Sequence, residues 1–128
     1  MVPETITEEV MVHSDEAARA IDAVEWLERV PDVPLTPQVA AWDLGPGESS
    51  VLSWTLAHPR TVAVIDDHAA RTCARVLGLP IVGTLGLALR AKTRGEVMLA
   101  APIVEELRMA GLYLSDRLIR EALSMVGE

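Results

Sequence analysis

Residues 60–86 read RTVAVIDDHAARTCARVLGLPIVGTLG, and the rest of the chain is organised around them. Residues 61–65 form a short apolar run rich in β-branched side chains, which is typical of a strand buried on both faces. After an Asp-Asp pair the apolar spacing becomes helical, and one helix face carries Ala70, Cys73, Ala74 and Leu77. Gly78 ends that predicted helix, and residues 79–82 form a second apolar run. Strand, helix and strand in this order predict a right-handed βαβ unit with parallel strands.

The acidic pair, Asp66 and Asp67, lies at the carboxyl end of the first strand, where open α/β sheets place their chemistry. An Asp at a strand-to-helix turn is also a good helix N-cap, so one of the two has an ordinary structural explanation. Two adjacent carboxylates repel each other unless a cation or a basic group offsets their charge. Glu48 is a third acid at a helix start, and the helix macrodipole alone would favour it there. If its helix follows a neighbouring parallel strand, the three acids converge on one edge.

Clustered carboxylates of this kind suit Mg²⁺ or Mn²⁺, which are hard ions that take oxygen ligands. Such ions can generate hydroxide and stabilise the transition state of phosphoryl transfer. A zinc site is not indicated, because His13, His58 and His68 are scattered and Cys73 is predicted to face the core. The sequence contains no nucleophile elbow, P-loop or dinucleotide-binding glycine fingerprint.

Composition limits the class of protein. The 128 residues suffice for one domain with one core, and that core must be aliphatic because phenylalanine is absent. The net charge of −8 and the pI near 4.8 argue against a broad basic nucleic-acid surface but leave room for a local basic groove. The single cysteine excludes an internal disulfide and fits a reducing cytosol. No membrane span or signal peptide is visible, so a cytoplasmic location is expected.

Helical patterns dominate the N-terminal half. Residues 2–12 predict a short helix that begins at Pro3 and carries Glu8 and Glu9 near its middle, with no strand before it. A second helix is predicted to end near Val30, capped by Ser14 or Asp15, with a stripe of Ala17, Ile21, Val24 and Leu27. Trp26 lies beside that stripe and is expected in the core or on a partner surface.

Proline and glycine residues mark the predicted limits of the remaining helices and connectors. Residues 31–37 form a proline-punctuated connector, and residues 39–44 are ambiguous between an edge strand and irregular structure. Helices are predicted for residues 48–58, 83–94 and 102–110, and Ser115 caps the last helix.

Four quoted segments carry a resemblance that covers essentially the whole chain. They are VPETITEEV at 2–10, LGPGESSVLSW at 44–54, IDDHAARTCARVLGLPIVGTLGLALRAKTRG at 65–95 and LRMAGLYLSDRLIREAL at 107–123. Their order and spacing resemble the PIN-domain nucleases of the VapC type. They are most similar to a branch catalogued as a domain of unknown function and described as predicted nucleic-acid-binding proteins.

The resemblance implies a single PIN-like domain over residues 1–128, an α/β fold with three α/β/α layers and a short parallel sheet. It implies a ribonuclease of the toxin–antitoxin kind, in which acids hold Mg²⁺ or Mn²⁺ and hydrolyse RNA phosphodiesters. By position, Glu9 matches the second family acid, Glu48 the third, and Asp66 with Asp67 the fourth, Asp67 being favoured as the ligand. Other residues are given supporting roles: Arg71 would pair with these Asp residues or with substrate phosphate, and Thr84 would hydrogen-bond the site.

The implied partners are RNA, a cognate antitoxin and a second copy of the chain in a homodimer. The helices near residues 103–109 and 118–125 offer apolar surface for that pairing.

The sequence departs from the family at its start. Family members open with a strand that ends in Asp, then a helix and a second strand, a unit of roughly 30 residues that is not seen here. Either Met1 is a misassigned start or this is a shortened, inactive member. A gap in the middle of the sheet is expected, with little nuclease activity until that unit is restored.

Two other function classes remain open. One is a non-catalytic PIN-like module that binds nucleic acid or protein. The other is a phospho-acceptor receiver domain, which residues 64–67 (VIDD) suggest. The receiver is disfavoured because its acidic pair ends the first strand, whereas here the pair lies past the middle of the chain.

Overall fold

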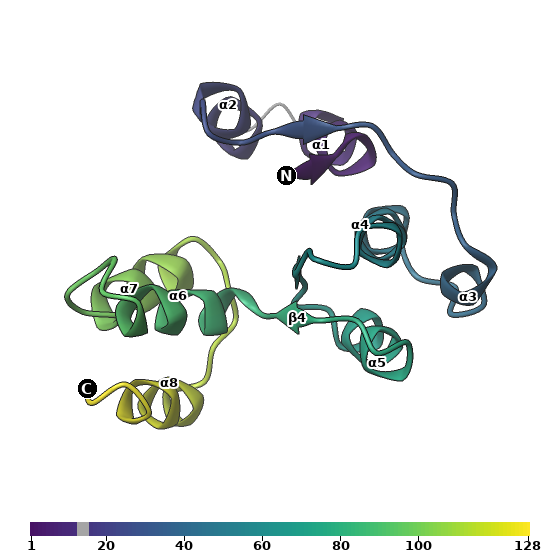
Figure 1. Cartoon of the computed structure of the whole chain (residues 1–128). Helices are drawn as coiled ribbons and strands as arrows, with labels where there is room; N and C mark the ends of the chain where they lie inside the picture. The colour runs from purple at the N-terminus through teal and green to yellow at the C-terminus, as the bar shows by residue number, and fades with distance from the viewer. Residues whose placement is uncertain (13–15) are drawn as a thin grey trace. The chain divides into compact units, whose positions relative to one another are not determined.

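The computed structural model describes residues 1–12 and 16–128. These residues divide into two compact units, Met1–Ile81 and Val82–Glu128. In the described parts of the chain the structure is mixed α/β, with eight helices and four two-residue strands that form two small parallel sheets (Figure 1). The expected single domain and its three layers remain predictions.

The first sheet joins segments from either side of two helices. Strand β1 (Val2–Pro3) pairs in parallel with β2 (Arg29–Val30), and helices α1 (Glu4–Val12) and α2 (Glu16–Ala23) lie between them in the chain. The helix predicted for residues 2–12 is confirmed over Glu4–Val12, but its predicted start at Pro3 and the absence of a strand before it are wrong. The prediction that the second helix continues to Val30 is also wrong, because the chain there pairs with β1 instead.

The sequence also predicted the cap of the second helix and the place of Trp26. The caps Ser14 and Asp15, together with His13 and the side chain of Ala17, lie outside the described residues. Trp26 is 83% exposed, so it is not part of the core.

Helices α3 (Pro37–Ala40) and α4 (Pro46–Ala57) follow β2. The ambiguity left for residues 39–44 is resolved against a strand, since Val39 and Ala40 end a short helix that Pro37 begins. Glu48 lies in the first turn of α4, as the sequence predicts.

The predicted βαβ order is confirmed in β3 (Ala63–Val64), α5 (His68–Val76) and β4 (Ile81–Val82), although both strands are shorter than their apolar runs. Gly78 closes α5 with a φ of +68°, a conformation that favours glycine. The prediction that the first strand is buried on both faces is wrong. Ala63 and Ile65 are buried, but Val62 and Val64 are each 48% exposed, because among the described residues this sheet has two strands and nothing covers these two side chains fully.

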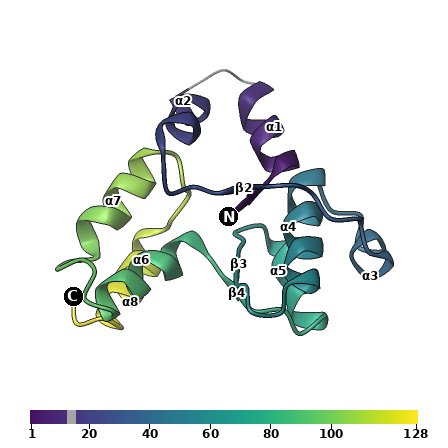
Figure 2. The same ribbon diagram turned by 45° about the horizontal axis from the view of Figure 1, so that its top comes forward.

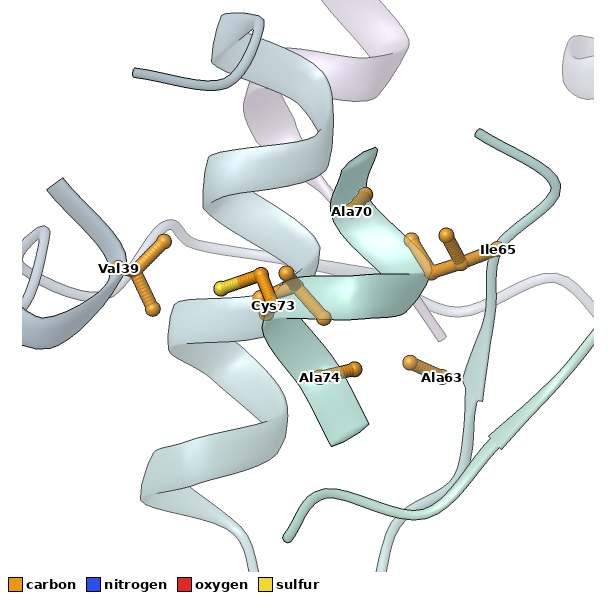
Figure 3. Close-up of a cluster of buried hydrophobic side chains, with 7 residues drawn as sticks. Val39, Ala63, Ile65, Ala70, Cys73 and Ala74 are labelled. Atoms are coloured by element: carbon orange, nitrogen blue, oxygen red, sulfur yellow. The ribbon is translucent and has the colours of Figure 1, made fainter. Parts of the chain in front are cut away.

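A cluster of mostly small side chains forms the core of the first unit (Figure 3). Its members come from α3, α4, β3 and α5 and from Ile65 directly after β3: Val39, Leu52, Ala63, Ile65, Ala70, Cys73 and Ala74. Three of these lie on one face of α5, as the helical spacing predicts, and Cys73 is fully buried as a small hydrophobic side chain. No aromatic side chain belongs to the buried cluster itself, although the partly buried Trp42 packs against it.

The second unit contains α6 (Thr84–Thr93), α7 (Ala101–Met109) and α8 (Asp116–Ser124) around buried Ala88, Val104 and Leu114. The predicted cap of the last helix is confirmed, because the Leu118 N–H donates to the Ser115 hydroxyl oxygen over 3.2 Å. None of the helices described is both long and apolar enough to cross a membrane.

Candidate functional site

Glu9 of α1 lies against the first turn of α4. The backbone N–H of Gly47 donates to Glu9 Oε1 over 3.0 Å. A Cβ atom at position 47 would lie only 2.6 Å from Glu9 Oε2 and 2.7 Å from Ile6 Cδ1, so glycine permits this close approach. The carboxylate thereby satisfies one of the N–H groups that a helix leaves unpaired at its start.

Glu48 brings a second carboxylate to the same helix end. Its side chain turns back toward the N-cap residue, since a Cβ atom built on Gly45 would lie 2.6 Å from Glu48 Oε2. The side chain of Glu48 is partly buried, whereas Glu9 is exposed. Two of the predicted site acids, Glu9 and Glu48, are therefore brought to the N-terminus of α4, where the helix macrodipole stabilises negative charge.

The Asp pair lies at the start of α5, and both residues are exposed. Asp67 is the N-cap of this helix, and its Oδ2 accepts a hydrogen bond from the Ala70 N–H over 2.9 Å. The sequence predicted that one Asp of the pair caps a helix, and Asp67 is that residue. A capping carboxylate uses one oxygen in this bond, so Asp67 Oδ1 remains for another ligand.

Arg71, one turn into α5, donates from Nη1 to the Ile65 carbonyl oxygen over 2.9 Å. The bond ties the guanidinium to the end of the strand segment that carries the Asp pair. Its predicted pairing with Asp or with a substrate phosphate stays a prediction. Thr84 is the first residue of α6, at the end of β4 as expected, and belongs to the second unit. The hydrogen bond that Thr84 was predicted to make to the site stays a prediction.

Helix α4 packs against both β3 and α5, and Figure 2 shows α4 and α5 side by side. The chain leaves the end of α4, passes through β3 and enters α5 at Asp67. By this connection the first turns of α4 and α5 lie toward the same end of β3, the carboxyl end. A shared cleft for Glu48, Asp66 and Asp67 follows from this topology as a prediction.

The donor chemistry of Glu9, Glu48, Asp66 and Asp67 fits Mg²⁺ or Mn²⁺, because all four side chains are carboxylates and such ions prefer oxygen ligands. Among the residues that the structure describes, however, no three acidic, His or Cys side chains are grouped closely enough to hold an ion. Two carboxylates are a sufficient number of protein ligands for Mg²⁺, which keeps several of its waters, so Glu9 and Glu48 remain candidates by their chemistry.

Asp32 is a structurally important residue that the sequence analysis did not single out. It accepts hydrogen bonds from the Thr5 N–H and from Thr5 Oγ1 at the start of α1, the latter over 2.5 Å. It also accepts one from the Ser50 hydroxyl of α4 over 2.8 Å. The Thr5 hydroxyl bond is the largest cause of the lowered pKa of Asp32, with further contributions from Ser50 and the Thr5 amide against an opposing effect of burial. Asp32 thus ties α1 to α4, the two helices that carry Glu9 and Glu48.

Comparison with known protein families finds a match over residues 1–128 to the family DUF3368, described as a PIN domain. No curated protein and no solved structure matches the chain significantly. The family match covers every residue from which the candidate site has been built, and it agrees with the resemblance seen in the sequence. The chain therefore belongs to the PIN domain family.

Proposed function

We propose that this chain carries the acidic centre of a Mg²⁺- or Mn²⁺-dependent ribonuclease that hydrolyses phosphodiester bonds. The observation that carries the proposal is the placement of Glu9 and Glu48 at the N-terminus of α4, each carboxylate close to a glycine of that helix start, in a member of the PIN domain family. Asp67 is not grouped with Glu9 and Glu48 in the described structure, and we propose that it joins them as a third ligand when the ion binds, with Asp66 beside it.

Each residue has a definite task in this proposal. Glu9 and Glu48 hold the ion, and the Gly47 N–H orients the Glu9 carboxylate by occupying Oε1. Asp67 keeps its Oδ2 on the α5 backbone, which fixes the direction of the carboxylate. When bound, the ion would activate a water molecule and neutralise charge on the scissile phosphate.

The biological setting proposed is that of a toxin–antitoxin pair, with RNA as substrate and a cognate antitoxin as partner. The support for it is family membership together with the acidic site. The net charge of −8 is compatible with RNA only if binding is confined to a local basic region.

The test is cleavage of end-labelled single-stranded RNA by this chain in Mn²⁺. Glu48→Gln is expected to lower the rate of cleavage about a hundredfold, because catalysis depends on accurate placement of the ion. The matched control is Glu8→Gln, which removes the same charge from an exposed position of α1. Equal rates for Glu48→Gln and its parent would refute the nuclease proposal.

A second candidate is a non-catalytic module that binds RNA through the same fold. It is favoured by the absence, within the described residues, of a three-member group able to hold an ion. Binding of the RNA without Mn²⁺-dependent cleavage would support this candidate over the nuclease.

A further inference from the structure

A pocket of about 400 Å³ lies within the unit Met1–Ile81. The connector between β2 and α3 lines it together with the first turns of α4, and Figure 2 shows this connector running past the start of α4. The described lining residues include none of the four candidate ion ligands. The pocket is therefore a separate feature of this unit, and its volume is in the range of pockets that hold small organic ligands.

The lining of this pocket is mostly apolar, with a few polar groups. Its apolar side chains come from the connector and from the start of α4: Val33, Leu35, Leu44 and Pro46. Its polar lining consists of hydroxyl groups and one carboxylate: Thr5, Asp32, Ser49, Ser50 and Ser53. Asp32 is thus the one charged residue among the described lining residues. Apolar walls with a small number of polar groups are the usual form of a small-molecule site.

The Asp32 carboxylate can accept a further hydrogen bond. It accepts from the Thr5 N–H, the Thr5 hydroxyl and the Ser50 hydroxyl, whereas two carboxylate oxygens offer about four acceptor sites. Among the described residues no Lys, Arg or His side chain forms an ion pair with Asp32, and no charged group contributes to its lowered pKa. A negative charge that is held by neutral donors alone favours a cationic ligand.

Ser53 supplies a second polar group to the pocket. Its side chain is 0% exposed, and its hydroxyl oxygen has no hydrogen-bond partner among the described residues. Thr55 of the same helix shows the ordinary solution, since its hydroxyl donates to the Val51 carbonyl over 2.9 Å. A buried hydroxyl without a partner costs free energy, which a hydrogen bond to a ligand would recover.

The two polar groups are close enough for one ligand head to reach both. Ser50, which holds Asp32, precedes Ser53 by one helical turn, and side chains at this spacing have Cβ atoms about 5–6 Å apart. An ammonium or guanidinium head carries several N–H donors and no acceptor, so it suits a pair of acceptor oxygens.

We propose that this pocket binds an alkylammonium or alkylguanidinium ligand, whose head donates to Asp32 and Ser53 and whose aliphatic stem lies along the apolar wall. The stem would cover Leu35, which is 55% exposed. An anion is disfavoured because the charged lining residue is itself negative. A nucleobase is disfavoured because none of the described lining residues is aromatic, so a base would have no ring to stack on.

The probe is pentylguanidinium, and its matched control is pentylurea, which has nearly the same shape but no charge. Binding is followed by NMR on the methyl groups of Leu35 and Leu44, in EDTA so that an ion at Glu48 plays no part. We expect saturable binding of pentylguanidinium in about the millimolar range, and binding of pentylurea at least about tenfold weaker. Equal affinities for the two ligands, or no saturable binding of pentylguanidinium, would overturn the proposal.

Substitutions locate the site. Asp32→Asn is expected to weaken binding of pentylguanidinium at least about tenfold, and Ser53→Ala at least about threefold. Asp43→Asn removes an exposed carboxylate elsewhere in the same unit and should leave the affinity unchanged. Equal losses in Asp32→Asn and Asp43→Asn, or no loss in Ser53→Ala, would overturn the assigned contacts. If Asp32→Asn fails to fold, the comparison of the two ligands on the unaltered chain decides.

A cationic head of this kind occurs both in free amines and in the side chains of other polypeptides. A blocked Gly-Arg-Gly peptide, compared with pentylguanidinium on the unaltered chain, separates these sources. Binding of the peptide at least about tenfold tighter would assign the pocket to a basic side chain of a partner. Equal or tighter binding of pentylguanidinium would assign it to a free organic cation.

Discussion

Asp67 caps a helix with one carboxylate oxygen and is proposed to bind the ion with the other. Its Oδ2 caps α5 through the Ala70 N–H, while Oδ1 is proposed to meet the ion. Asparagine is about as good an N-cap as aspartate, but its side chain carries no charge and is a poor ligand for a hard cation. Substitution at this one position therefore separates helix capping from ion binding.

Asp67→Asn is expected to change the free energy of unfolding by less than about 1 kcal/mol, whereas Asp67→Ala should cost roughly 0.5–2 kcal/mol because the cap is lost. Both variants are expected to bind Mn²⁺ less well. Urea denaturation measures the first effect and an Mn²⁺ titration the second. If asparagine destabilised the chain as much as alanine does, the capping role assigned to the carboxylate oxygen would be wrong.

At the scale of elements, Asp32 connects α1 with α4. Hydrogen bonds from Thr5 and Ser50 stabilise its ionised form, which lowers its pKa below the ordinary value of 3.8. A group whose pKa is lowered by folding contributes stability above its unfolded-state pKa. That contribution is lost as the pH falls through the folded-state pKa.

Unfolding measured between about pH 5 and pH 2 should therefore show a smaller loss of stability in Asp32→Asn than in the unaltered chain. The asparagine side chain keeps an acceptor for Thr5 but does not titrate. Asp43→Asn, which removes an exposed carboxylate from a turn of the same unit, serves as the control and should retain the full acid dependence. Identical pH profiles for Asp32→Asn and the unaltered chain would contradict the assigned role.

The sequence predicted the elements whose signal is local. Residues 60–86 show apolar spacing, an Asp cap and a glycine stop, and the strand, helix and strand appear there in order. The strands β1 and β2 were missed because two residues have no periodicity and their pairing joins distant parts of the chain. Pro37 was read as part of a connector, although proline also begins helices.

Only part of the candidate site could be predicted from the sequence. Glu48 and Asp67 were placed correctly at helix starts, since both signals are local. The contact of Glu9 with Gly47 depends on how α1 packs on α4, which a single sequence does not reveal. Asp32 stands between prolines and reads as a connector residue, so its bonds to two helices had no visible signal.

At the scale of the whole molecule, self-association is proposed through α7 and α8. Large apolar side chains remain exposed there, with Met109 and Met125 each 81% exposed and Leu118 44% exposed. Helices α7 and α8 each pack against α6, and large exposed apolar side chains on such a unit favour contact with another protein surface.

Light scattering over a micromolar concentration series is expected to show a dimer. Leu118→Glu should shift the chain toward monomer by at least about tenfold in dissociation constant, because a charge is buried in the contact. Met98→Glu is the control, since Met98 is 91% exposed and lies between α6 and α7 rather than on α7 or α8. A monomer at every concentration would contradict the proposed homodimer.

Glu9 and Glu48 are proposed to share an ion at the N-terminus of α4. An Mn²⁺ titration followed by electron paramagnetic resonance tests this sharing on the unaltered chain, Glu48→Gln and Glu8→Gln. We expect Glu48→Gln to weaken Mn²⁺ binding at least about tenfold and Glu8→Gln to change it less than about twofold. Equal affinities for Glu48→Gln and the unaltered chain, or equal losses in the two variants, would contradict it.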